Sequence, residues 1–162
     1  MSVKPIVMDP NPVLNQKCEP VTSFDSKLKK LARDMFDTMY EADGVGLAGP
    51  QIGVLKRIAV IDADDETGPF VLINPEITEQ TGEELGVEGC LSIPNVYGEV
   101  IRAQSVTVQA VDVKGRPFSL KAEGYVARAI QHELDHLDGI LFTTKVVRYI
   151  EEADLEEEVV EE

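Results

Sequence analysis

Two histidines and a glutamate form an H-E-x-x-H pattern late in the chain, at His132, Glu133 and His136. In an α-helix the two imidazoles would project from the same face, about one turn apart, and could bind one metal ion. Glu133 would lie about 100° around the helix from His132, where its carboxylate could take a proton from a metal-bound water. The chain has no other histidine, so this pattern is its clearest indication of chemistry.

A catalytic site for a zinc-like ion needs three protein ligands and one open position, so a third ligand must come from elsewhere. A glutamate on a following helix, as in thermolysin-like peptidases, would require a helix after Gly139, but residues 140–144 (ILFTT) are typical of a strand. Cys90 is the better candidate, because a glycine precedes it, we expect a loop to present it, and a thiolate is a strong metal ligand.

The histidine pattern falls in a predicted helix that begins after Gly124 and ends at Gly139. Apolar residues surround this helix so broadly that we expect it to be buried, which would place the imidazoles in a shielded pocket. Apolar residues at helical spacing predict an earlier helix from Leu28 to Met39, which Gly44 ends.

Strands and loops are predicted for the remaining segments. The expected strands are residues 57–61, 70–73, 76–81, 106–110 and 117–120. Residues 1–24 contain four prolines and are predicted to form an irregular arm. Residues 44–53 contain four glycines but lack the spacing of nucleotide-binding loops, so we interpret them as bare backbone against which an extended peptide could lie.

Length and composition indicate one domain, residues 1–150, followed by an acidic tail at residues 151–162. The net charge of −15 disfavours nucleic-acid binding. Two cysteines are too few for a disulfide scaffold, and the sequence shows neither a signal peptide nor a membrane span. We therefore expect a cytoplasmic protein that binds neither nucleic acid nor membrane.

Three segments together resemble the signature motifs of the peptide deformylases, in the same order: residues 44–51 (GVGLAGPQ), 88–92 (EGCLS) and 131–136 (QHELDH). The resemblance extends from the N-terminal arm to about Thr144. It implies an α+β fold of one domain, with antiparallel sheets wrapped around a central helix that carries the H-E-x-x-H pattern. It also implies removal of the formyl group from the N-terminal formylmethionine of newly made bacterial or organellar chains, with release of formate.

The resemblance implies a role for each motif residue. Cys90, His132 and His136 would bind the metal, and Glu133 would act as base and then as acid. The Gln51 side-chain amide and the Leu91 backbone N–H would stabilise the oxyanion, and Gly46 would pair with the peptide backbone. Our candidates for the methionine pocket flank the glycine segment or precede the histidines by one or two turns: Val45, Tyr125 and Ala129.

The family's physiological metal is usually ferrous iron, and zinc, nickel or cobalt can occupy the site. We expect a monomer in the bacterial cytoplasm that acts on N-formylmethionyl peptides and nascent chains. This chain departs from the family in having Gly49 where alanine is common, and its acidic tail does not resemble the basic C-terminal helix with which some members meet the ribosome. Arg102 matches a family arginine, which we interpret as support behind the metal ligands.

Two other functions, and one interpretation without a function, also account for the histidine pattern. A zincin-like metallopeptidase would use the same histidine pattern but would cleave within chains, and no downstream third ligand is evident. A metal-binding or partner-binding module without catalysis would fill all four metal positions with Cys and His, whereas only three good ligands are apparent. The interpretation without a function is a solvated helix face with an incidental histidine pair.

Overall fold

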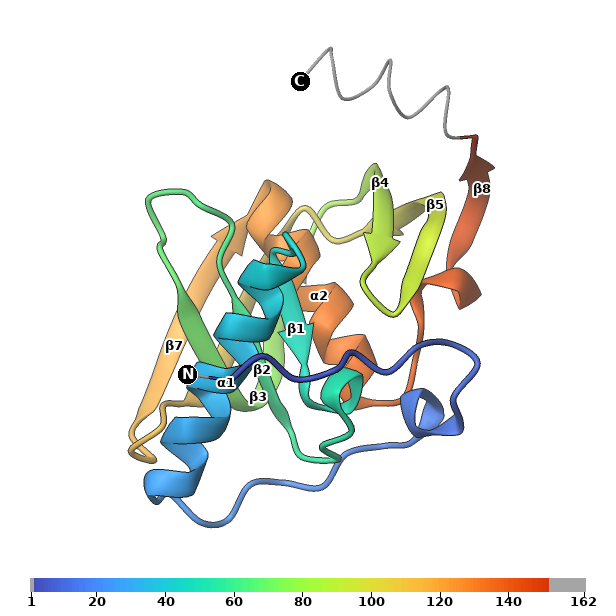
Figure 1. Cartoon of the computed structure of the whole chain (residues 1–162). Helices are drawn as coiled ribbons and strands as arrows, with labels where there is room; N and C mark the ends of the chain where they lie inside the picture. The colour runs from blue at the N-terminus through green and yellow to red at the C-terminus, as the bar shows by residue number, and fades with distance from the viewer. Residues whose placement is uncertain (1, 152–162) are drawn as a thin grey trace.

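Helix α2 (Gly124–Leu137) lies between two antiparallel sheets in the computed structural model, which describes residues 2–151 (Figure 1). The larger sheet has the strand order β1 (Gly46–Ala48), β2 (Ile58–Ile61), β3 (Phe70–Thr81), β6 (Ser105–Val111) and β7 (Pro117–Glu123). The smaller sheet has the order β4 (Glu84–Cys90), β5 (Ile93–Arg102) and β8 (Val146–Ile150). The predicted α+β fold of one domain is therefore confirmed, and α2 carries the histidine pattern.

Helices α1 (Ser26–Glu41) and α2 cover opposite faces of the larger sheet. Successive residues of a strand point to opposite faces, so neighbouring residues of β2 contact different helices. Every residue of β2 is buried. Ile58 and Val60 pack in one cluster with Met35 of α1, whereas Ile61 packs in another with Ile130 of α2. Strand β2 thus packs against both helices, and its contact with α2 helps to fix the position of that helix.

The N-terminal arm contacts the segment after β1 and the turn after β4. It contains a short 3₁₀ turn, Pro12–Asn15. The Val7 N–H donates to the carbonyl of Gln51 at 2.7 Å, and the Asp9 N–H donates to the carbonyl of Ser92 at 2.9 Å. The arm is irregular, as predicted, but its backbone hydrogen bonds join the loop after β1 to the turn after β4.

Two local predictions were wrong. Residues 140–144 do not form a strand: Phe142–Thr144 is a 3₁₀ helix, and the strand is β8, which begins at Val146. Cys90 is not in a loop but is the last residue of β4. The β4 segment ELGVEGC contains two glycines and two glutamates, so its strand structure comes from pairing with β5 and not from its own propensity.

Other boundaries agree more closely with the sequence. The predicted segments 70–73 and 76–81 are joined in β3, with register shifts along its pairing to β6. Gly139 follows α2 with φ +75°, the left-handed conformation expected after a helix C-terminus. No helix within residues 2–151 is long and apolar enough to cross a membrane. Apart from residue 151, the predicted acidic tail lies outside the described residues.

Candidate active site

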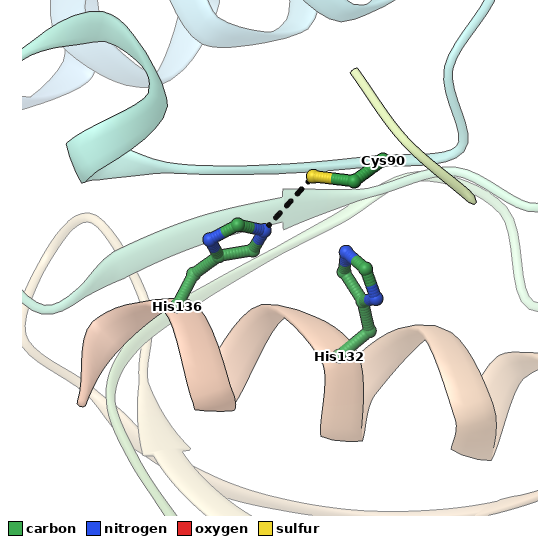
Figure 2. A group of neighbouring side chains, drawn as sticks. All are labelled: Cys90, His132 and His136. Atoms are coloured by element: carbon green, nitrogen blue, oxygen red, sulfur yellow. Dashed lines mark hydrogen bonds between the residues drawn. The ribbon is translucent and has the colours of Figure 1, made fainter. Parts of the chain in front are cut away.

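Cys90, His132 and His136 converge where the end of β4 meets α2 (Figure 2). The Cys90 Sγ lies 3.3 Å from the His136 Nε2, and the two imidazole centroids are 5.0 Å apart. One ligand atom from each of the three residues lies within 4.8 Å of the others. The end of β4 and one side of α2 thus bring three possible metal ligands together.

The carboxylate of Glu88 lies behind one imidazole of this group. It is buried and accepts hydrogen bonds from Arg102 Nε at 2.8 Å, Arg128 Nη1 at 2.7 Å and His132 Nδ1 at 2.9 Å. Burial alone would raise the pKa of Glu88, but the hydrogen bonds from Arg102 and His132 hold it well below its usual range. Because the ionised carboxylate can only accept, His132 donates through Nδ1 and keeps Nε2 for the metal side.

Burial and neighbouring groups shift the pKa values of the two histidines in opposite directions. Burial holds the pKa of His136 well below its ordinary value, so this imidazole is neutral and offers a lone pair. Burial also opposes a charge on His132, but contacts with Cys90 and Glu88 raise its pKa to about 10. Binding of a cation would therefore displace a proton from this part of the site. One sulfur and two imidazole nitrogens form a donor set that fits a divalent transition metal.

Glu133 follows His132 on α2 and is also buried. Its Oε1 has no hydrogen-bond partner among residues 2–151, which is unusual for a buried carboxylate. Burial raises the pKa of Glu133 to about 7. The carboxylate is therefore suited to accept and return a proton near neutral pH.

Gln51 contacts the three-ligand group through Cys90. It lies in a 3₁₀ turn (Gly49–Ile52) after β1 and is almost fully buried. Its Oε1 accepts from the Ala48 N–H at 3.0 Å, and its Nε2 donates to the Ser92 Oγ at 3.2 Å and to the Cys90 Sγ at 3.6 Å. These bonds fix the orientation of the amide and direct its N–H groups towards Cys90.

A cavity of about 430 Å³ brings the predicted site residues together. It is lined by all of them except His136, which is fully buried: Val45, Gly46, Gln51, Cys90, Leu91, Tyr125, Ala129, His132 and Glu133. The glycine segment, the turn after β4 and one face of α2 thus border a single space. A cavity that combines possible metal ligands with apolar lining residues is typical of a small-molecule site in an enzyme.

Sequence reasoning did not identify Glu88, Ser92 or Arg128 as parts of this site. Glu88 stands two residues before Cys90 on the same face of β4, and Arg128 stands one helical turn before His132. The available signal for Arg128 was its position four residues before His132, which places both on the same side of the predicted helix. Nothing in the sequence distinguished Ser92, whose hydroxyl matters only because Gln51 folds back onto it.

Known proteins resemble this chain over almost its whole length. The family model described as polypeptide deformylase matches residues 3–151. Peptide deformylase 1 of Bacillus subtilis (strain 168) is 57% identical over 155 residues, which cover 96% of this chain and 97% of that protein.

Solved structures of peptide deformylases have the same fold as this chain. The crystal structure of a peptide deformylase from Legionella pneumophila has a TM-score of 0.87 and 46% identity, covering 90% of this chain and 86% of that one. The peptide deformylase from Thermotoga maritima also gives a TM-score of 0.87, at 41% identity, covering 90% of this chain and 99% of that one. The fold is thus shared with solved structures of peptide deformylases that are 41% and 46% identical to this chain.

Proposed function

The chain belongs to the peptide deformylase family, and from this premise we propose that the Cys90–His132–His136 group and Glu133 form its catalytic centre. The protein is a metal-dependent hydrolase that removes the formyl group from the N-terminal formylmethionine of newly synthesised polypeptides and releases formate. One observation carries the assignment of the centre: three ligand atoms lie within 4.8 Å of one another, beside the cavity that Glu133 also lines.

Cys90, His132 and His136 would hold one divalent cation. When bound, the cation would supply Lewis-acid chemistry, polarising the formyl carbonyl and making water more acidic. We assign ferrous iron as the ion in the cell, and the sulfur and imidazole donors also suit zinc, nickel and cobalt. Glu88 would keep the His132 ring in the orientation that directs Nε2 to the cation.

Glu133 would move the proton. Its unpartnered Oε1 accepts a proton from the attacking water, whose oxygen forms a bond to the formyl carbon. The carbon–nitrogen bond then breaks, and Glu133 returns the proton to the leaving amine while formate departs. The raised pKa of the carboxyl supports both halves of this transfer near neutral pH.

Gln51 and Leu91 would stabilise the negative charge that develops on the formyl oxygen. The Gln51 Nε2 is already directed to the metal group by its bonds to Ser92 and Cys90. Leu91 follows Cys90 and borders the same cavity, and its backbone N–H would face the formyl oxygen. Two donors fixed before the reaction would lower the barrier without reorganisation.

The rest of the cavity would bind the peptide. Gly46 in β1 would pair with the substrate backbone as an added strand. Val45, Tyr125 and Ala129 would contact the methionine side chain, because all three line the cavity and none belongs to the three-ligand group. On α2, Ala129 and Tyr125 precede Glu133 by one and two turns, so they line one continuous wall.

We also propose that the protein acts as a monomer in the bacterial cytoplasm, on nascent chains, without contacting nucleic acid or membrane. The net charge of −15 supports the absence of nucleic-acid binding, since phosphate recognition requires a basic surface. The bacterial origin of its relatives supports the location.

Formate release from formyl-methionyl peptides, after anaerobic loading with each metal, tests the proposed centre. Activity that depends on metal and is lost in the Cys90→Ala variant is the expected result. An N-acetyl peptide of the same sequence is the matched control and should remain intact. A Cys90→Ala variant that binds metal and releases formate at the parent rate would overturn the assignment. Cleavage within blocked, non-formylated peptides would instead indicate a zincin-like peptidase.

A further inference from the structure

A buried ion pair forms part of the cavity wall between α2 and the smaller sheet. Arg128 projects from α2 one turn before His132, and Glu88 faces it from β4. Both border the cavity, although only 8% of the Arg128 side chain and 4% of the Glu88 side chain are exposed. An arginine is an unexpected wall for a space that otherwise receives an apolar side chain.

The guanidinium of Arg128 is held in place from three directions. Its Nη1 donates to Glu88 Oε2 at 2.7 Å and to the carbonyl of Val100 at 3.0 Å. Its Nη2 donates to the carbonyl of Glu84 at 2.8 Å. The side chain therefore joins α2 to both β4 and β5, and its planar end cannot turn away without losing several charge-assisted bonds.

Gly86 provides the space that this guanidinium occupies. A Cβ on Gly86 would lie 2.8 Å from the Arg128 Cζ and 2.9 Å from its Nε and Nη2. Atoms at these distances overlap, so any larger residue at position 86 would push the guanidinium off the strand. The glycine and the arginine therefore work as a pair, and a change at either position alters the same wall.

We propose that Arg128, seated on Gly86, sets the depth of the methionine pocket and is a specificity-determining residue. The inference rests on the proposed function and extends it. Arg128 stands four residues before His132 on α2, and four residues rise about 6 Å along a helix. That span suits an extended side chain of four non-hydrogen atoms, such as methionine. A longer substrate side chain would collide with the guanidinium of Arg128, which hydrogen bonds hold in place.

The test compares deformylation of three peptides that differ only in the first residue: methionine, the shorter norvaline and the longer straight-chain 2-aminooctanoic acid. Replacing the guanidinium in Arg128→Ala should raise kcat/KM for the longer peptide relative to methionine about tenfold or more, since the fit of one methylene is worth about 10–200-fold. Gly86→Ala should act in the opposite direction, because it forces the guanidinium towards the cavity, and should favour norvaline over methionine.

The ratios between peptides distinguish this role from a structural one. A variant that lowers kcat/KM for all three peptides by the same factor has lost stability or catalysis, not selectivity, and would overturn the inference. Gly86→Ala keeps the Arg128–Glu88 charges, so it remains informative if Arg128→Ala does not fold. If the metal-loaded parent protein releases formate from none of the peptides, the proposed function itself fails, and this inference fails with it.

Discussion

Gly46 lies directly against the carboxylate of Glu133. A Cβ built on Gly46 would overlap the Glu133 Oε2 and contact its Cδ at 3.0 Å. Strand β1 therefore passes so close to α2 that only a bare backbone fits between them. The glycine that we propose as a partner for the peptide backbone also leaves room for the proposed base.

Replacing Gly46 with alanine should displace Glu133 and lower kcat more than it raises KM. A methyl group cannot share space with the carboxylate, so Oε1 would leave the position from which it takes a proton. Steady-state kinetics on a formyl-methionyl peptide provide the measurement, with metal content as the control. A change confined to KM would show that Gly46 serves peptide binding alone.

The Glu133→Gln substitution should keep the metal and lose most turnover. The amide has the shape of the carboxylate but cannot accept a proton, and general-base catalysis contributes about 10²–10⁴-fold to a rate. Metal content and formate release are measured on the same sample. His132→Ala is the matched control, and it should lose both metal and activity. Deformylation by Glu133→Gln at the parent rate would show that Glu133 is not the general base.

Replacing Glu88 with alanine should weaken metal binding and destabilise the fold. Arg102, Arg128 and His132 all donate to this carboxylate, so its loss leaves buried charges without a partner, at a cost of about 3–5 kcal/mol. Loss of a group that orients a metal ligand typically lowers affinity about 10–100-fold. Urea unfolding and chelator competition measure the two effects.

Glu99 provides a matched control for Glu88 on the neighbouring strand. It pairs with Arg148, whose side chain is 65% exposed, so solvent screens that interaction. Glu99→Ala should cost no more than about 1 kcal/mol and leave metal affinity unchanged. Equal effects of the two substitutions would contradict the buried role assigned to Glu88.

The sequence was most informative where local spacing determines geometry. His132 and His136 are four residues apart in a helix, so their convergence follows from helical periodicity alone. Gly139 ended this helix as predicted because few other residues adopt its left-handed backbone readily.

Features that depend on distant pairing could not be predicted in the same way. Residues 84–90 are strand only because β5 pairs with them, and their glycines give no β signal. The convergence of Glu88 with Arg102 and Arg128 joins three elements whose approach no local pattern encodes. Gln51 and Ser92, 41 positions apart, meet for the same reason.

Removing the metal should lower the stability of the protein. A ligand that binds only the folded state stabilises it by about 2.7 kcal/mol at one hundred times its dissociation constant. A strong chelator should therefore lower the thermal midpoint of the loaded protein. The Cys90→Ala variant should respond much less to the chelator, because it lacks one ligand. Equal shifts in the two proteins would show that the stabilising metal binds elsewhere.

Ser92→Ala should reduce kcat through Gln51. The Ser92 side chain is fully buried, and its Oγ accepts from the Gln51 Nε2 at 3.2 Å, so the hydroxyl fixes the direction of the amide. Loss of an oxyanion donor itself costs about 10²–10³ in rate, and misdirecting the donor should cost less. A double-mutant cycle with Gln51→Ala measures the coupling. If Ser92 acts by positioning the amide, its substitution should have no further effect on kcat once Gln51 is alanine, whereas additive losses would indicate a separate contribution to the fold.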